Sequence, residues 1–178
     1  ARAYRALLEH RSARDIVVAG DSAGANIAAG LMFRLREAGV PLPAGLVLDT
    51  PATDLTASGD TWSTNDGIDT VLVGDFVPPM HLYVGDADIR HPEVSPLFGD
   101  FTGGFPTTLL LSGTRDRLLS DTVRLHRALL AAGVSVELHV FEAQGHGGFM
   151  GTAPEDRERS AVVRRFVADR LTPAYEPQ

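Results

Sequence analysis

A serine, an aspartate and a histidine of this sequence stand where they could form a catalytic triad. Ser22 lies in the motif Gly20-Asp21-Ser22-Ala23-Gly24, which follows the apolar run of residues 16–19 and precedes an alanine-rich segment with good helix propensity. A strand, a tight turn and a helix in this order hold a serine hydroxyl above the end of a sheet, where it is a nucleophile. Positions 20 and 24 are predicted to need small residues, here Gly20 and Gly24, so that the strand and the helix can approach closely.

The other two residues of this motif have predicted supporting roles. The backbone N–H of Ala23 stands at the start of the helix, where it can donate to the oxyanion that forms when a serine attacks a carbonyl. We expect the carboxylate of Asp21 to brace the turn through local hydrogen bonds. The motif therefore supplies a nucleophile, one oxyanion donor and three residues of support: Gly20, Asp21 and Gly24.

A serine nucleophile needs a base within hydrogen-bonding reach, and His146 is the predicted base. It is the one histidine of six that follows a predicted strand in a glycine-rich turn, Gln144-Gly145-His146-Gly147-Gly148-Phe149. His139 lies inside that strand and His126 on the polar side of a predicted helix. The remaining three histidines have no glycines to present them: His10, His81 and His91.

The base in turn needs a carboxylate that orients it, and Asp116 is the predicted acid. Asp116 is at the carboxyl end of the strand that precedes the histidine strand, which matches the chain order serine, acid, histidine. Asp121 is the alternative, although its position is typical of the N-cap of the following helix. Asp49 and Asp54 follow an earlier strand.

Alternating strands and helices must position these residues, and this order predicts an α/β fold with a mainly parallel, doubly wound sheet of four strands. The apolar runs predict four strands: Ile16–Gly20, Gly45–Asp49, Thr107–Ser112 and Val134–Phe141. Helical periodicity is seen in five segments: residues 2–10, 22–38, 71–84 with an interruption near Pro78-Pro79, 121–132, and 157–171 starting near Pro154. Residues 52–68 and 86–105 are predicted to be irregular. We expect one catalytic domain over residues 1–178, with 172–178 as a flexible tail.

Composition excludes several other kinds of chemistry. The net charge of −7 gives nucleic-acid binding no electrostatic support, and the absence of cysteine excludes disulfides and thiol nucleophiles. All sixteen basic residues are arginine, so Schiff-base chemistry and a P-loop lysine are excluded too. The spacing of the acidic residues Asp54, Asp60, Asp66 and Asp69 fits no calcium loop and predicts solvated loop charge. We expect no metal and no cofactor.

The apolar runs are too short to span a bilayer, and no signal peptide opens the chain. A cytoplasmic location is therefore the expectation.

Three motifs together resemble the hormone-sensitive-lipase-like (bacterial family IV) esterases of the α/β-hydrolase superfamily. They are Gly20-Asp21-Ser22-Ala23-Gly24-Ala25-Asn26, Asp116-Arg117-Leu118 and Gly145-His146-Gly147-Gly148-Phe149. The resemblance extends over nearly the whole chain and includes residues 50–56 and 94–97. It implies Ser22 as nucleophile, His146 as general base and acid, Asp116 as the orienting acid, and Ala23 as an oxyanion donor. Arg117 stands where the family usually has proline, a difference that we interpret as lying outside the chemistry.

The resemblance further implies that this chain is the C-terminal portion of such an esterase. The family's His-Gly-Gly loop, which supplies further oxyanion donors, should precede the serine motif, and no such motif precedes Ser22. The cap helices and the first half of the sheet are expected before it as well. We therefore expect an open edge along the first strand, covered by a second copy in a homo-oligomer or by an N-terminal segment.

The function that the resemblance implies is a serine carboxylesterase that hydrolyses short- to medium-chain carboxylic esters through an acyl-enzyme. Its partner is then a small-molecule ester. Two alternatives stay open: an amidase or peptidase that uses the same triad, and an inactive or binding-only fragment of an esterase.

Overall fold

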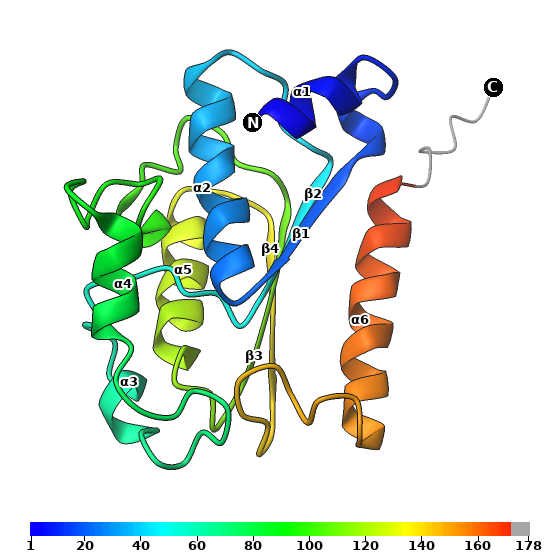
Figure 1. Cartoon of the computed structure of the whole chain (residues 1–178). Helices are drawn as coiled ribbons and strands as arrows, with labels where there is room; N and C mark the ends of the chain where they lie inside the picture. The colour runs from blue at the N-terminus through cyan, green and yellow to red at the C-terminus, as the bar shows by residue number, and fades with distance from the viewer. Residues whose placement is uncertain (172–178) are drawn as a thin grey trace.

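Four parallel strands form one sheet in the computed structural model, which describes residues 1–171 (Figure 1). The strands are β1 (Val17–Asp21), β2 (Gly45–Asp49), β3 (Thr108–Gly113) and β4 (Val136–Phe141), in the order β1-β2-β3-β4. Each neighbouring pair is parallel. The predicted α/β fold with a four-stranded parallel sheet is thereby confirmed. The predicted tail, residues 172–178, lies outside the described residues.

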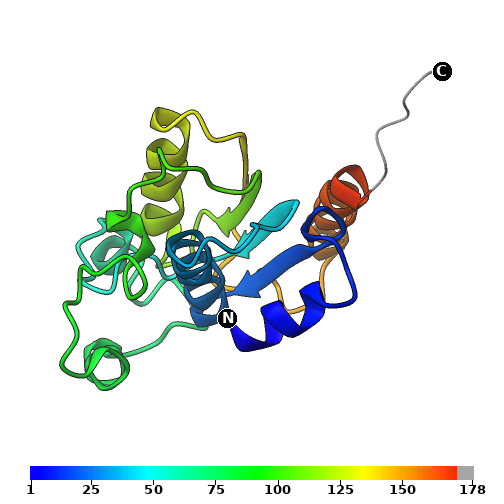
Figure 2. The same cartoon turned by 90° about the horizontal axis from the view of Figure 1, so that it is seen from above.

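Helices cover both faces of this sheet. Helices α2 (Ala23–Glu37) and α5 (Leu119–Ala131) lie on one side, and α6 (Pro154–Leu171) lies on the other (Figure 1 and Figure 2). The larger core contains the buried apolar residues of α2 and α5, together with Tyr4 of α1 (Arg2–Leu8). A smaller core joins α6 to the opposite face through Val162 and Phe166. Strands β2 and β3 read as continuous apolar runs because they are covered on both faces.

The parallel register places the carboxyl ends of all four strands at the same end of the sheet. Asp21 pairs with Asp49 at the ends of β1 and β2, and Gly113 pairs with Phe141 at the ends of β3 and β4. The loops that follow these ends carry the residues predicted to do chemistry. The side chains of these residues can therefore meet at the carboxyl end of the sheet.

The segment between β2 and β3 differs from its prediction. The predicted helix over 71–84 is α4 (Val77–Val84) only, and the predicted loop 52–68 contains a short helix, α3 (Thr61–Thr64). Residues 71–76 are not helical because two of their backbone N–H groups, those of Val71 and Leu72, donate to the Asp69 carboxylate. Pro78-Pro79 does not interrupt the helix either, since it lies in the first turn of α4, where backbone N–H groups have no helical partner.

The interpretation of Asp121 as a helix N-cap is wrong. α5 begins at Leu119, so Asp121 is inside its first turn, where it is fully buried. One carboxylate oxygen accepts the backbone N–H groups of Thr53 and Asp54, each at 2.9 Å, and the other accepts the Trp62 indole N–H at 3.3 Å. Asp121 thus holds the segment after β2 against α5.

The remaining bounds agree with the predictions to within two or three residues. Two 3-10 turns, Ala13–Asp15 and Pro96–Phe98, were not predicted. Among the helices of residues 1–171, none combines the length and the apolar character that crossing a bilayer requires.

Candidate active site

The turn that carries Ser22 is a strained elbow between a strand and a helix. Ser22 stands between the last residue of β1 and the first of α2 with φ 56° and ψ −120°. A positive φ of this kind costs a non-glycine residue about 1–3 kcal/mol. The backbone N–H of Ser22 donates to the Asp49 carbonyl at 2.9 Å, and its own carbonyl accepts the N–H of Ala25 at 3.1 Å. The end of β2 and the first turn of α2 therefore hold the strained conformation.

Only one of the two glycines predicted to allow this turn is required by a close contact. A Cβ on Gly20 would lie 2.3 Å from the carbonyl oxygen of Gly24, so strand and helix approach there as predicted. A Cβ on Gly24 would meet no described atom within 4 Å, which corrects the prediction for that position. The backbone N–H groups of Ala23 and Gly24 make no hydrogen bond within residues 1–171. The Ala23 N–H thus remains available beside Ser22.

The structure brings Ser22, His146 and Asp116 together in one hydrogen-bonded chain. His146 Nε2 lies 2.8 Å from Ser22 Oγ, and His146 Nδ1 lies 3.1 Å from Asp116 Oδ1. Because a carboxylate only accepts, the imidazole proton belongs on Nδ1, which leaves Nε2 to accept the serine hydroxyl proton. This is the arrangement in which a histidine acts as a general base.

Two further groups hold the Asp116 carboxylate in its buried position, and a third holds its backbone. Its Oδ1 also accepts the backbone N–H of Leu118 at 2.9 Å, and its Oδ2 accepts the hydroxyl of Ser112 at 2.7 Å. Asn65 donates to the Asp116 backbone carbonyl at 2.9 Å. Asp116 is fully buried, so the donors to its carboxylate replace the water that would otherwise solvate its charge.

The electrostatic surroundings raise the pKa of His146 above its ordinary value. Burial acts to lower this pKa, but the hydrogen bond and negative charge of Asp116 outweigh burial, and the charges of Asp21 and Asp69 add to the increase. A raised pKa means that the imidazolium is stabilised. The imidazolium is the state that a histidine base reaches when it takes the proton of a serine.

Asp69 ties the loop of the acid to the loop of the base. Its Oδ2 accepts the backbone N–H of Arg117 at 2.9 Å, and its Oδ1 accepts the backbone N–H of His146 at 3.4 Å. Burial alone would raise the pKa of Asp69, but these two N–H groups and those of Val71 and Leu72 bring the pKa below its ordinary value. A buried, charged Asp69 therefore joins the segments on either side of the triad.

The interpretation of the acidic cluster as solvated loop charge is wrong for two of its members. Asp69 is 2% exposed and Asp54 is fully buried. Burial would raise the pKa of Asp54, but hydrogen bonds from Ser58, Thr56 and Arg124 lower it. In residues 1–171 no three acidic or histidine side chains are grouped so that they could hold a metal ion.

Helix α6 supports the histidine loop from the other face of the sheet. Buried Arg159 donates to the Gln144 side-chain oxygen at 2.7 Å and to both carboxylate oxygens of Asp49. Burial raises the pKa of Asp49, and the hydrogen bonds and charge of Arg159 oppose this increase. At Gly113 a Cβ would lie 2.0 Å from the Gln144 carbonyl oxygen, so the end of β3 passes very close to this loop.

The other candidates from the sequence lie outside the triad. His139 is on β4 beside Glu137, with 3.5 Å between their side chains. The Asp21 carboxylate is exposed and accepts the hydroxyl of Thr50 at 3.0 Å, so it braces the end of β2 rather than its own turn. Arg117, whose difference from the family's proline was interpreted as lying outside the chemistry, is buried next to the acid in the sequence.

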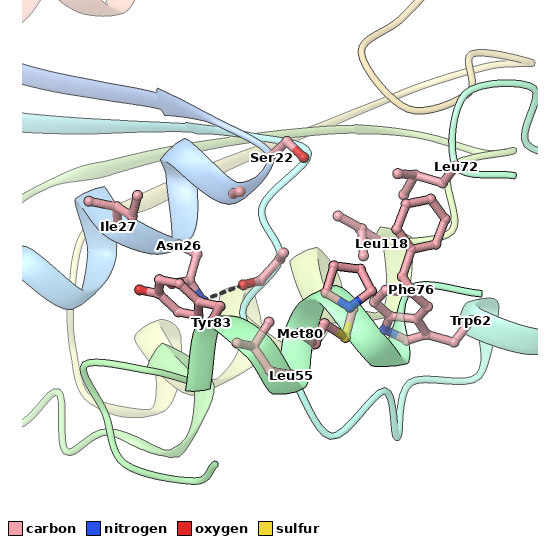
Figure 3. A pocket seen from close by; sticks show the side chains of 13 residues that line it. Ser22, Asn26, Ile27, Leu55, Trp62, Leu72, Phe76, Met80, Tyr83 and Leu118 are labelled. Atoms are coloured by element: carbon pink, nitrogen blue, oxygen red, sulfur yellow. Dashed lines mark hydrogen bonds between the residues drawn. The ribbon is translucent and has the colours of Figure 1, made fainter. Parts of the chain in front are cut away.

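An apolar pocket of about 360 Å³ opens at Ser22. Figure 3 shows Ser22 above the pocket, with Ile27 and Tyr83 toward one end and Leu72, Phe76 and Trp62 toward the other. The lining comes from the first turns of α2, from the segment after β2, from α3 and α4, and from Leu118. A pocket of this volume, apolar and with one nucleophile at its mouth, suits a small molecule with an apolar group.

Comparison with known proteins assigns the class to which this arrangement belongs. Residues 1–150 match the family model described as alpha/beta hydrolase fold. This chain therefore belongs to the alpha/beta hydrolase fold family.

Three relatives narrow the assignment within that family. The chain is 34% identical over 169 residues to an acetyl-hydrolase of Streptomyces hygroscopicus, covering 93% of this chain and 56% of that protein. It is similar to the structure of esterase E25, with 42% identity and a TM-score of 0.90 over 96% of this chain and 53% of that one. A hormone-sensitive lipase from a metagenome library has 34% identity and a TM-score of 0.91 over 96% of this chain and 58% of that one.

The predicted resemblance to hormone-sensitive-lipase-like esterases is thus confirmed. The chain spans about half the length of the curated relatives it matches.

Proposed function

We propose that this chain carries the catalytic triad and the substrate pocket of a carboxylic-ester hydrolase. The observation that carries the proposal is the continuous chain from Ser22 Oγ through His146 to Asp116, at the mouth of an apolar pocket. Its relatives include an acetyl-hydrolase and an esterase, which supports the same reaction.

In the first half-reaction, Ser22 Oγ attacks the ester carbonyl carbon while His146 Nε2 takes the hydroxyl proton. Asp116 stabilises the resulting imidazolium, and the Ala23 N–H donates to the carbonyl oxygen as negative charge develops on it. The bond between the carbonyl carbon and the alcohol oxygen then breaks. The alcohol leaves with the proton from His146, and the acyl group stays on Ser22.

The second half-reaction repeats these roles with water in place of the alcohol. His146 takes a proton from water as the water oxygen attacks the acyl carbon. The bond to Ser22 breaks, the carboxylic acid leaves, and His146 returns its proton to Ser22. Short to medium acyl chains are the proposed substrates because the pocket beside Ser22 is apolar and of limited volume.

The test is labelling of the intact chain by an alkyl fluorophosphonate, read by mass spectrometry. We expect one adduct on the wild-type chain and none on Ser22→Ala. Ser160→Ala, which removes an exposed serine of α6, is the matched control and should label like wild type. Wild-type chain that stays unlabelled would refute catalysis by this chain and favour a binding-only fragment.

We also propose that another strand pairs with the outer edge of β1. Within residues 1–171, β1 pairs with β2 alone, and its exposed edge carries unpaired backbone groups. A second copy or an N-terminal segment would cover it. Sedimentation analysis over a range of concentrations separates the two, because only self-pairing increases the mass with concentration.

A further inference from the structure

One wall of the substrate pocket is also a wall of a second cavity. The second cavity has a volume of about 440 Å³ and is lined partly by polar residues, among them Ser63, Asp66 and Asp75. Trp62, Phe76 and Met80 line both cavities. These three side chains therefore form a partition that separates the apolar pocket from its polar neighbour.

Residues 62–76, here called the wall segment, contribute Trp62 and Phe76 to this partition. Apart from the end of the short helix α3, the wall segment contains no helix or strand. Its position therefore depends on contacts with side chains. The segment faces the loop of the triad acid, where Asn65 donates to the carbonyls of Thr114 and Asp116.

Arg117 makes the largest set of these contacts. Its guanidinium donates to the Trp62 carbonyl at 2.9 and 3.2 Å, to the Leu72 carbonyl at 3.1 Å and to the Gly74 carbonyl at 2.9 Å. Its charge pairs with Asp66 at 3.2 Å. Each of these four partners belongs to the wall segment.

The guanidinium also contacts the two rings of the partition directly. It lies 5.4 Å from the centre of the Trp62 ring and 5.8 Å from that of Phe76. The planar fork of an arginine can serve several carbonyls and contact aromatic faces at once, which the single ammonium of a lysine cannot do equally well. Arg117 itself is only 8% exposed, so water cannot replace these donors without rearrangement.

We propose that Arg117 is a positioning residue that determines substrate specificity. It fixes the wall segment as a closed partition between the two cavities and so limits the length of the acyl chain that the pocket accepts. This inference rests on the proposed ester hydrolysis. Without the guanidinium, three carbonyls of the wall segment lose their donor and two rings lose their cation. A longer chain could then extend into the second cavity.

The main experiment compares Arg117→Met with wild type on p-nitrophenyl butyrate and p-nitrophenyl dodecanoate. Methionine keeps an unbranched apolar side chain and removes every donor. We expect the ratio of kcat/KM for dodecanoate to that for butyrate to rise about tenfold or more, since a few added methylenes in an apolar site account for such a factor. The change should come from a lower KM for dodecanoate, and Arg117→Lys should give an intermediate ratio.

Trp62 supplies a second readout because it is the sole tryptophan of the chain. In Arg117→Met its emission should shift to the red and become more sensitive to acrylamide, as water reaches the indole. This readout does not need turnover. If the wild-type chain hydrolysed no ester, the proposed function would fail, and the Trp62 emission would still decide whether Arg117 holds the partition.

Arg115→Met is the matched control, because Arg115 flanks the triad acid on its other side and is exposed. Within residues 1–171 its side chain makes no hydrogen bond or ion pair, so this variant should keep both the wild-type ratio and the wild-type emission. If Arg117→Met fails to fold, Phe76→Ala opens the same partition while leaving every hydrogen bond of Arg117 in place, and it should raise the same ratio. An unchanged ratio and emission in Arg117→Met, or an unchanged ratio in Phe76→Ala, would overturn the inference.

Discussion

The proposed nucleophile and the proposed acid–base pair of this site differ in how deeply their surroundings are buried. On the nucleophile side, Asp21, Ala23 and Gly24 are exposed, and Ile27 one turn later is 58% exposed. On the acid–base side, Asp116 is fully buried and His146 is 6% exposed. The two sides nevertheless meet through one hydrogen bond of 2.8 Å, from Ser22 to His146.

The difference shows which part of the site this chain organises by itself. The acid–base side draws support from β3, from residues 61–76 and from α6, all within the chain. The nucleophile side depends on one neighbouring strand, β2, and on the first turn of α2. Removing the reactive side chain on the exposed nucleophile side should therefore affect chemistry alone, whereas replacing the buried acid should affect both chemistry and folding.

The largest expected effect sharpens this contrast. Ser22→Ala should reduce ester hydrolysis by about 10⁶-fold, since serine proteases lose about that much with their nucleophile. Its free energy of unfolding should stay within about 0.5 kcal/mol of wild type, as for surface substitutions generally. Asp116→Asn should reduce hydrolysis by about 10⁴-fold and also destabilise the fold by about 2 kcal/mol, because the amide loses the charge and keeps only one acceptor oxygen for three donors. Equal free energies of unfolding in urea for Ser22→Ala and Asp116→Asn would contradict this contrast between the two sides.

Within the nucleophile side, the two glycines of the elbow should behave in opposite ways. Gly20→Ala forces a Cβ to 2.3 Å from a backbone oxygen, so we expect a loss of about 3 kcal/mol or more, as for severe overpacking. Gly24→Ala meets nothing and lies in the first turn of α2, so a gain of up to about 1 kcal/mol is expected from helix propensity. Thermal unfolding of the two variants measures this, and a destabilised Gly24→Ala would show that the open space is absent in solution.

On the acid–base side, Asp121 should make stability depend on pH. Burial raises the pKa of Asp121 to about 7, while its N–H donors oppose the increase. The folded state then binds a proton that the unfolded state releases above about pH 4, so the contribution of Asp121 falls as pH rises from about 4 to 7. The free energy of unfolding, measured in urea, should fall in wild type relative to Asp121→Asn as pH rises through this window, by about 2–4 kcal/mol. Parallel curves would argue against a protonated Asp121 in the fold.

The smallest expected effect distinguishes two influences on His146: the negative charge of nearby carboxylates and the hydrogen bonds that hold its loop. Asp21→Asn and Asp69→Asn each remove a negative charge that raises the pKa of His146, so this pKa should fall in both variants. Since the base must be neutral to act, the acidic limb of the pH profile for kcat/KM should move to lower pH in both. Only Asp69 also holds the N–H groups of Arg117 and His146. Asp69→Asn should therefore lower kcat about tenfold at high pH as well, a loss within the range for misplaced catalytic groups. If kcat at high pH were the same in Asp69→Asn and Asp21→Asn, Asp69 would act on His146 through its charge alone.

Much of this architecture was predictable because it is encoded locally. The apolar runs gave the four strands, and the glycine-flanked Ser22 and His146 gave the loops that present them. The chain order of serine, acid and histidine then selected Asp116 from its neighbours. The strand and turn signals each reside in a few consecutive residues, and the order of the three residues is read along the chain, so neither needs knowledge of spatial contacts.

The segment between β2 and β3 was the least predictable part for the opposite reason. The helix expected over 71–76 does not form because Asp69 and Arg117 take its backbone groups. Asp69, Asn65 and Trp62 gave no periodic signal, and an acidic residue in a loop predicts solvation unless a buried partner is known. A proline-to-arginine difference beside the acid was the one local hint that this region is special.

The sequence by itself therefore determined the fold class and selected Ser22, His146 and Asp116 as the proposed triad, because short-range propensity and chain order specify them. Only the tertiary structure decided which carboxylates are buried and charged, which glycine of the elbow is indispensable, and which side chains form the pocket. Those properties depend on contacts such as Asp69 with His146 and Arg117 with Trp62, whose partners are 77 and 55 residues apart. Burial and hydrogen bonding at such separations arise only when the chain is folded, and they set the electrostatics and the shape of the site.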